Sequence, residues 1–392
     1  MTFMKAKLEW VLLAVLLVFA AYVHQSARLV PYDSHGDNGS EVSDTRYALD
    51  PSIAFDPGFK SVNELRNSRY QPLQGMVYAW MGENFIFKNR AIVPMTLFYL
   101  MHLFNILIVY RIARGLFGKA VPALVSAFYF SIHRSVIPVT RYWCGGIHVV
   151  SVTAVLVFFL VFLEYFKTGK KRYYAVTLAA YAPMLLLKET TVYFLILAGL
   201  YDWVFRSPAG SLKQRLAAFF SRVHIYYPFL LITLLHTAVT KIYTFYDSVH
   251  LYHRRGDVWD PRWVLPRMFD HVVFGWWPGI QYPYEAVAAK MTIALGFLAF
   301  LYWALRHGSP QVRFAFMAAG AYLFLGSTYL SPPVTELTRR LYVPLPFYAM
   351  AVTGIAWDPR LGKAAAWCLK AGLFVYLIVY VCMPLRILGV LS

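Results

Sequence analysis

The chain has 392 residues, of which 59% are hydrophobic and only 14% are charged, and its mean hydropathy is +0.51. These values exclude an ordinary soluble domain, in which about a quarter of the residues are charged, and they predict an integral membrane protein. The formal net charge of +18 comes from short basic clusters between apolar runs rather than from one basic stripe. No nucleic-acid partner is therefore expected.

Apolar runs recur along the whole chain and predict an all-α polytopic membrane protein. About eleven of them are long enough, or nearly long enough, to cross a hydrocarbon core of about 30 Å as helices. The first run could also be a secretory signal, but the polytopic pattern favours an uncleaved anchor. In chain order the runs are 8–24, 92–110, 120–133, 147–166, 173–187, 191–205, 224–240, 288–305, 314–330, 341–356 and 364–384.

Basic residues between these runs predict the topology. If the N-terminus lies inside, the basic loops at 111–119, 167–172, 206–222, 306–313 and 360–363 all lie inside as well, as the positive-inside rule requires. The long segments 25–91 and 241–287 then lie outside, together with turns at 134–146, 188–190 and 331–340. We expect one transmembrane domain over 1–392, a first outer loop that carries short interfacial helices, and no separate soluble domain.

An adjacent cation and anion, Lys188 and Glu189, interrupt the apolar stretch "YAPMLLLKETTVYF". Charges that flank a membrane helix often extend to water, so the pair could simply end a span. The alternative is a polar site at the outer boundary of the membrane. The predicted topology places two carboxylates of the first outer loop, Asp33 and Asp37, on the same side and close to the end of the first helix.

No cofactor is firmly predicted. Asp33, His35 and Asp37 could hold a divalent cation through hard oxygen ligands. Asp247, His250 and His253 have spacings that a metal ion could use, although a polar outer loop that recognises a substrate explains them as well. His102 and Asn105, three residues apart in one apolar run, are expected to form hydrogen bonds between helices.

The order of several segments resembles the GT-C superfamily of membrane glycosyltransferases, and its pattern is most similar to the O-mannosyltransferase-like branch. An acidic outer loop follows the first span. The later segments come in the same order as in that branch: "RYQPLQGMVYAW" (Arg69–Trp80), "HLFNILIVYRIARGLFG" (His102–Gly118), "FYFSIHRSVIPVTRYWCGG" (Phe128–Gly146), "LLLKETTVYF" (Leu185–Phe194) and "TRRLYVPLPFYAMAVTGI" (Thr338–Ile355).

This resemblance implies transfer of a sugar from a polyprenyl-phosphate carrier to the hydroxyl of a protein, lipid or glycan acceptor. It makes Asp33 and Asp37 the candidate catalytic carboxylates. The implied donor-phosphate residues are Lys188, Glu189, Arg339, Arg340 and Arg69. Residues of the second long outer loop implied in substrate recognition are His250, Arg254 and Arg255. The implied location is a bacterial inner membrane with the active site facing the periplasm, or an equivalent luminal face.

The sequence also departs from the family pattern. Gln71-Pro72-Leu73 stands where the family commonly has Arg-Pro-Leu, and His133-Arg134 stands where it has His-Pro. Two other functions remain open. A ligase that moves a whole glycan from a diphosphate carrier would use the loop with His250, Arg254 and Arg255. A transporter or flippase for lipid-linked glycans would need charges and broken helices near the midplane of the membrane.

Overall fold

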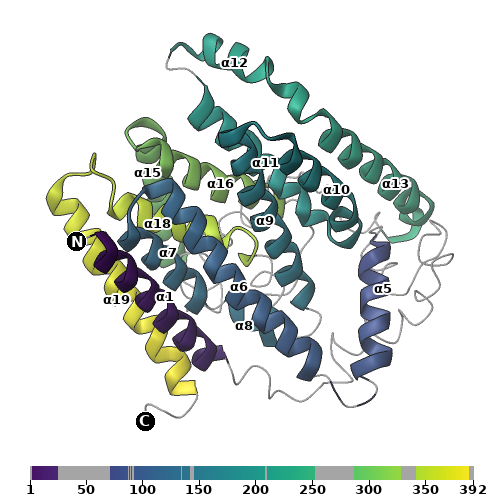
Figure 1. The fold of residues 1–392 in the computed structure, drawn as a ribbon, viewed down its shortest axis with the longest axis horizontal. Coiled ribbons are helices and arrows are strands. Elements are labelled where there is room, and N and C mark those ends of the chain that lie inside the picture. Colours follow the sequence, from purple (N-terminus) through teal and green to yellow (C-terminus); the bar gives the residue numbers. More distant parts are fainter. Residues whose placement is uncertain are drawn as a thin grey trace. The chain divides into compact units, whose positions relative to one another are not determined.

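The computed structural model describes residues 2–24, 71–86, 88, 90, 92–133, 135–141, 145–207, 210–251, 287–327 and 341–387. Every regular element in these ranges is a helix (Figure 1). The prediction of an all-α protein is therefore confirmed for the described part of the chain.

Each predicted apolar run coincides with a helix. By length and composition, α6 and α9 can each span a membrane, and the bent pair Leu212–Ile225 and Tyr227–Thr240 is a further candidate among the described residues. The expected number of spans is thus not confirmed. The helices are α1 (Thr2–His24), α6 (Ile92–Phe117), α7 (Ala120–Ile132), α9 (Gly146–Thr168), α10 (Lys171–Leu187), α11 (Tyr193–Tyr201), α13 (Tyr227–Leu251), α15 (Val287–Arg306), α16 (Pro310–Ser327), α18 (Leu345–Ala356) and α19 (Lys363–Ile387).

Shorter helical elements lie between these long helices. Two of them, α5 (Pro72–Met81) and the π-helix η3 (Gly82–Ile86), belong to the segment predicted as the first outer loop, and α8 (Val136–Arg141) belongs to a predicted turn. The 3₁₀ helix η5 (Glu189–Val192) and the π-helix η6 (Asp202–Arg206) flank α11. The amphipathic helix α12 (Leu212–Phe220) and the 3₁₀ helix η7 (Val223–Ile225) replace a predicted basic loop.

Helix α13 continues through Leu251 and so extends into the segment predicted as the second outer loop, which begins at residue 241; the side of the membrane on which that segment lies stays a prediction. The sequence "KIYTFYDSVHL" that forms this extension contains no glycine or proline. The residues that most strongly interrupt a helix are therefore absent from it.

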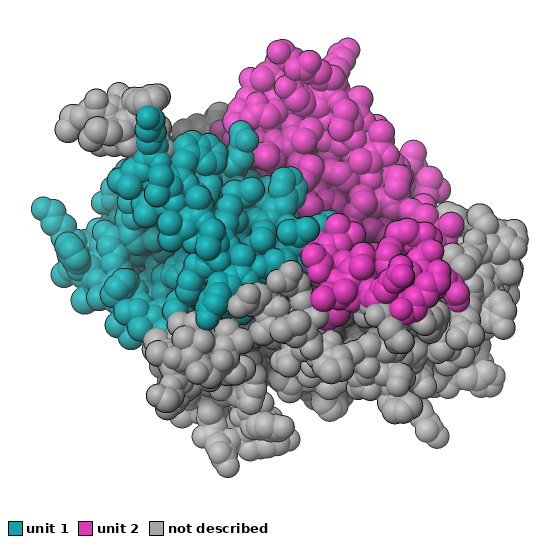
Figure 2. Space-filling view, turned by 60° about the horizontal axis from the view of Figure 1, so that its bottom comes forward, with its two compact units in different colours: residues 1–29, 99–141, 261–392 teal, residues 30–98, 142–260 magenta. Residues whose placement is uncertain are grey.

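The described residues cluster into two compact units (Figure 2). The first unit contains residues 1–29, 99–141 and 261–392, and the second contains residues 30–98 and 142–260. The single transmembrane domain expected over 1–392 stays a prediction.

Helix α7 is the centre of the first unit, where it packs against α1, α18 and α19. Ala123 and Ala127 of α7 are fully buried, and small residues of this kind let membrane helices approach closely. Gly354 of α18 has the same role, since a Cβ atom there would lie 3.0 Å from the ring of Phe117. The core of this unit therefore depends on small residues at helix crossings.

The outer faces of α1 and α19 in the first unit are strongly apolar. Trp10 and Val18 of α1 are 62% and 69% exposed, and Trp367 and Phe374 of α19 are 72% and 66% exposed. Exposed apolar side chains in such number are rare on soluble proteins. These faces fit a hydrocarbon environment and support the membrane assignment.

The hydrogen bonds expected from His102 and Asn105 are present and link α6 to the residue run before α18. His102 Nδ1 lies 2.8 Å from the Tyr342 hydroxyl, and the Asn105 amide donates to the same hydroxyl at 3.2 Å. All three side chains are fully buried. The predicted hydrogen bonding of His102 and Asn105 is confirmed, although their partner lies in the turn before α18 rather than in a helix.

Contacts within the first unit join residues that lie in or next to the predicted inside loops. Glu9 near the start of α1 forms an ion pair with Arg114 near the end of α6, with 2.8 Å between Oε1 and Nε. Arg360 donates to the Gly308 carbonyl at 2.8 Å, and Asp358 accepts from the Ser309 amide at 2.7 Å. These contacts agree with the predicted grouping of loops, while the side of the membrane stays a prediction.

Helix α10 is the centre of the second unit and contacts α5, α9 and α13. Its Tyr181 hydroxyl bonds to Thr233 of α13 at 2.7 Å. Aromatic rings fill the space around it, with Phe194 and Phe229 at centroid distances of 6.0 and 5.3 Å from the Tyr181 ring. This packing fixes the register of α10 and therefore the position of the residue that follows it.

Replacing Tyr342 by phenylalanine is expected to destabilise the first unit. The change removes the hydroxyl that His102 and Asn105 share, and leaving buried polar groups without that partner costs about 1–3 kcal/mol. Denaturant titration of the protein in detergent measures the loss in the free energy of unfolding. Tyr302→Phe is the control, because Tyr302 is 63% exposed and its change should stay within about 0.5 kcal/mol. Equal stability of the two variants would contradict the assigned role of Tyr342.

Candidate functional site

The boundary between α10 and α11 is a capped helix break. Pro183 lies inside α10, and proline weakens a helix by removing a backbone donor. The backbone of Lys188 is extended, with φ −157° and ψ 123°. The Lys188 amide donates to the Met184 carbonyl at 2.9 Å, and the Thr191 hydroxyl donates to the same oxygen at 3.1 Å. The break is thus a defined structure with its terminal carbonyl satisfied.

Lys188 and Glu189 lie in this break and are shielded from water. Lys188 is 5% exposed, and the Glu189 side chain is 17% exposed. Lys188 Nζ lies 3.9 Å from Glu189 Oε2. Because burying an ammonium group is costly without an opposite charge, Glu189 stabilises Lys188 at this place. Lys188 does not extend into water, in contrast to a simple flanking charge.

Two further elements hold the break in place. From the residue before α5, Gln71 donates a hydrogen bond through Nε2 to Glu189 Oε2. From α9, the Ser151 hydroxyl bonds to Thr190 at 2.6 Å. The residues Gln71, Lys188 and Glu189 form what we call the break cluster. Sequence reasoning noted Gln71 only as a departure from the family's Arg-Pro-Leu and missed its contact with Glu189.

The other candidate site residues cannot be placed with the break cluster. The side chains of these residues lie outside the described part of the structure. They are the candidate site residues Asp33, Asp37, Arg69, His250, Arg254, Arg255, Arg339 and Arg340, and the possible metal ligands His35, Asp247 and His253. Among the side chains that are described, no group of three or more His, Cys, Asp or Glu residues is arranged to hold a metal ion.

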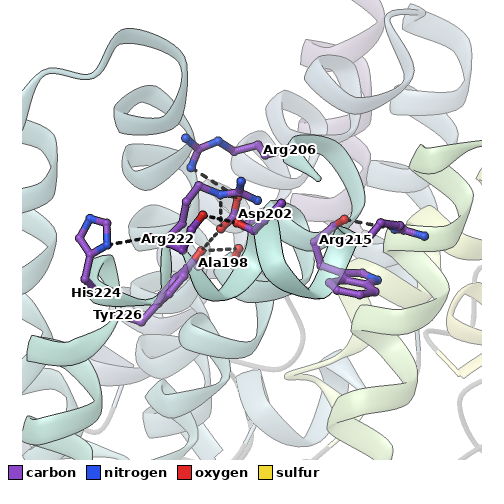
Figure 3. Close-up of polar contacts among 10 residues, drawn as sticks. Ala198, Asp202, Arg206, Arg215, Arg222, His224 and Tyr226 are labelled. Atoms are coloured by element: carbon purple, nitrogen blue, oxygen red, sulfur yellow. Dashed lines mark hydrogen bonds and ion pairs between the residues drawn. The ribbon is translucent and has the colours of Figure 1, made fainter. Parts of the chain in front are cut away.

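A second polar cluster lies at the other end of the α10–α11 hairpin and was not predicted (Figure 3). Asp202 is fully buried, and Arg222 Nε donates to its two carboxylate oxygens at 2.9 and 3.2 Å. Arg206 lies 3.5 Å away, and the Tyr226 hydroxyl donates to Asp202 at 3.3 Å. We call these four residues the elbow cluster. Its only signal in the sequence was an acid four residues before Arg206, at the end of an apolar run.

The length of α10 separates the two clusters. Its 17 residues correspond to about 25 Å at 1.5 Å per residue, which is most of the thickness of a hydrocarbon core of about 30 Å. The basic residues Lys171 and Arg172 stand at the start of α10, and Lys188 follows its end. The break cluster is therefore expected near one boundary of a membrane rather than at its midplane.

One comparison with known proteins bears on this arrangement. Residues 74–240 match the family model described as dolichyl-phosphate-mannose-protein mannosyltransferase. The resemblance to the GT-C superfamily is thereby confirmed. That family indicates a membrane glycosyltransferase that uses a lipid-linked sugar. No curated protein matches the chain.

The matched region has a clear relation to the two clusters. It covers Lys188, Glu189 and the whole elbow cluster, but it begins after Gln71 and ends before the second long outer loop. Asp33, Asp37, Arg339 and Arg340 lie outside it. The break cluster therefore contains the candidate site residues that both the structure and the family match include.

Asp202→Asn is expected to destabilise the second unit, because the buried carboxylate forms ion pairs with two guanidinium groups. The expected loss is about 2 kcal/mol, below the range for fully buried pairs because the arginines keep some exposure. Glu164→Gln is the matched control: it removes an exposed partner of Lys167, and such pairs contribute about 0–1 kcal/mol. Unfolding in detergent distinguishes the two changes, and a loss at Asp202 no larger than at Glu164 would contradict the role of the elbow cluster.

Proposed function

We propose that this protein transfers a sugar from a polyprenyl-phosphate carrier to an acceptor hydroxyl, at the periplasmic face of a bacterial inner membrane or an equivalent luminal face. The observation that carries the proposal is the buried pair Lys188 and Glu189 in a capped helix break inside the region that matches a mannosyltransferase family. The acceptor is a protein, lipid or glycan hydroxyl.

The chemistry needs a cation where the sugar leaves its phosphate. Negative charge grows on the departing oxygen, and a positive group in a poorly hydrated place stabilises that charge strongly. Lys188 has the charge and the 5% exposure that this role requires. The carrier's polyprenyl chain stays in lipid, so the phosphate meets the protein at the membrane boundary, where the length of α10 is expected to place Lys188.

Glu189 is assigned a positioning role rather than proton transfer. Its Oε2 faces both Lys188 Nζ and the Gln71 amide. A carboxylate held in this way compensates the charge of the buried ammonium and orients it. Gln71 in turn couples the start of α5, which belongs to the predicted first outer loop, to the break.

The general base is assigned to Asp33, ahead of Asp37, from the resemblance and from its place after the first span. A carboxylate that accepts the acceptor's proton typically contributes about 10²–10⁴-fold to the rate. Arg339, Arg340 and Arg69 are assigned to the same donor phosphate as Lys188. His250, Arg254 and Arg255 are assigned to substrate recognition, and a divalent cation shared by Asp33 and Asp37 stays an open alternative.

The position of the break favours this reading over a flippase. A transporter of lipid-linked glycans would use charges on broken helices near the midplane. The break after α10 instead follows about 25 Å of continuous helix, and the basic residues gather at the opposite end of that helix. Lys188 is thus expected at one membrane boundary and the basic residues at the start of α10 at the other. This placement suits an enzyme that works at a membrane surface.

Lys188→Gln is expected to lower the rate of sugar transfer by about 10²–10³-fold, the scale for removing one donor to a developing oxyanion. Lys188→Arg should recover part of the rate, because it keeps the charge with a different geometry. Mass spectrometry of lipid-linked sugars and glycan products in membranes with each variant measures turnover. Lys167→Gln is the matched control, since the Lys167 side chain is 55% exposed. A Lys188→Gln protein with the control's rate would remove Lys188 from the site.

Asp33→Asn is expected to abolish transfer while donor binding survives, because asparagine keeps the shape but accepts no proton. Asp37→Asn should do less, unless both residues share a cation, in which case a chelator also stops the wild-type enzyme. Transfer rate and donor affinity in nanodiscs measure both changes. Activity in both variants, with loss in Arg254→Ala and Arg255→Ala, would favour the ligase; an inactive Asp37→Asn beside an active Asp33→Asn would reverse the assignment of the base.

A further inference from the structure

Helix α12 is encoded locally although none of its residues is buried. Ser211 and Gln214 form a capping box, in which the Ser211 hydroxyl accepts from the Gln214 amide at 3.3 Å and the Gln214 side chain accepts from the Ser211 amide at 2.9 Å. A capping box stabilises a helix start without tertiary packing. The helix therefore forms at the surface of the second unit.

One face of α12 is docked on the unit and another is apolar and exposed. The Phe219 ring packs against Trp203 at 6.0 Å between centroids, and Arg215 lies over the Trp203 ring at 4.7 Å. The exposed face carries Leu212, Leu216 and Phe220, four residues apart and thus neighbours on the helix. These side chains are 66%, 38% and 60% exposed.

The elbow between α12 and α13 determines how the exposed face is directed. Leu212–Ile225 and Tyr227–Thr240 meet at 71°, and the elbow cluster joins η6 to both sides of this bend (Figure 3). Beyond the bend, Leu231, Leu234 and Leu235 of α13 are 58%, 64% and 58% exposed, as expected for a helix in hydrocarbon. With α13 as the spanning half of this bent pair, α12 at 71° to it lies close to the plane of the membrane.

The end of the unit that carries α12 has excess positive charge. Its acidic residues are already paired, Asp202 with two arginines and Glu164 with Lys167. Lys170, Lys171 and Lys213 are exposed. The full set of basic residues at this end is Lys167, Lys170, Lys171, Arg172, Arg206, Lys213, Arg215 and Arg222.

We propose that α12 and the exposed lysines around it bind acidic phospholipid headgroups, with Leu212, Leu216 and Phe220 in the acyl boundary. An apolar face beside basic residues is the composition of helices that lie in a membrane interface. Charge complementarity selects acidic lipids over neutral ones. The apolar face is joined to the exposed leucines of α13 through the elbow, so one lipid surface contacts both. This binding site does not depend on the proposed transfer reaction.

The first experiment measures lipid selectivity on the full chain. The protein is exchanged into nanodiscs of phosphatidylcholine with one fifth phosphatidylglycerol, and native mass spectrometry counts the retained phosphatidylglycerol. The variant Lys170→Gln/Lys171→Gln/Lys213→Gln should retain at least roughly fivefold less, the contribution of about one basic residue near an acidic surface. The control Lys119→Gln/Arg306→Gln/Lys363→Gln removes equal charge from exposed positions of the first unit and should lose clearly less phosphatidylglycerol, because these positions do not surround α12.

The second experiment measures the depth of α12 in the membrane. It keeps all the lysines, so it does not depend on whether the charge variants fold. A spin label is placed by Leu216→Cys, or by Ala217→Cys as the control, after Cys144, Cys368 and Cys382 are replaced by serine. Position 217 is exposed and about 100° around the helix from position 216. The label at 216 should be more accessible to oxygen and less accessible to a water-soluble nickel reagent. Equal nickel access at both positions, or equal lipid loss in the two charge variants, would overturn the proposal.

Discussion

An ionised side chain that is taken out of water must be compensated inside the protein, and this constraint decides where the described charges lie. Asp202 is fully buried and is matched by Arg206 and Arg222, and Lys188 is matched by Glu189. Both sets stand where a regular α-helix ends: Lys188 and Glu189 in the break after α10, and Asp202 and Arg206 in the π-helix that follows α11. Helix ends leave backbone groups without intrahelical partners, so polar side chains collect at the same places.

This coupling makes the α10–α11 hairpin the element on which the rest of the second unit depends. The aromatic packing of Tyr181, Phe194 and Phe229 fixes the hairpin laterally. One end then presents the break cluster and the other end the elbow cluster. Because α10 connects them, the position of Lys188 depends on the packing around Tyr181 as well as on the contacts of Gln71 and Ser151 at the break itself.

Much of the fold could be predicted from the sequence, because apolar runs decide the helices of a membrane protein almost alone. The position of every predicted run agrees with a helix, and the polar pair His102 and Asn105 was recognisable inside an apolar run. Helix α12 was missed because its basic residues indicated a loop. Its signals were local: the serine and glutamine of the capping box and three apolar residues spaced four apart.

The candidate site was less predictable, since its partners come from segments far apart in the chain. Lys188 and Glu189 stood out as charges in an apolar stretch, but nothing local connects them to Gln71, more than a hundred positions earlier. The elbow cluster shows the same limit, because Asp202 resembles an ordinary charge at a helix end until Arg222 and Tyr226 are brought to it by a bend.

The bend itself links the two proposals in physical terms. An interfacial helix fixed at 71° to a lipid-facing span resists tilting of that span, because tilting would pull exposed apolar residues into water or push lysines into hydrocarbon. Through the contact of α13 with α10, such an anchor also limits movement of α10 along the membrane normal. Since Lys188 follows α10 directly, its depth relative to the headgroup level would be set from the opposite boundary. A cation meant for a lipid phosphate needs this control of depth, because the phosphate itself stays at a fixed level in the bilayer.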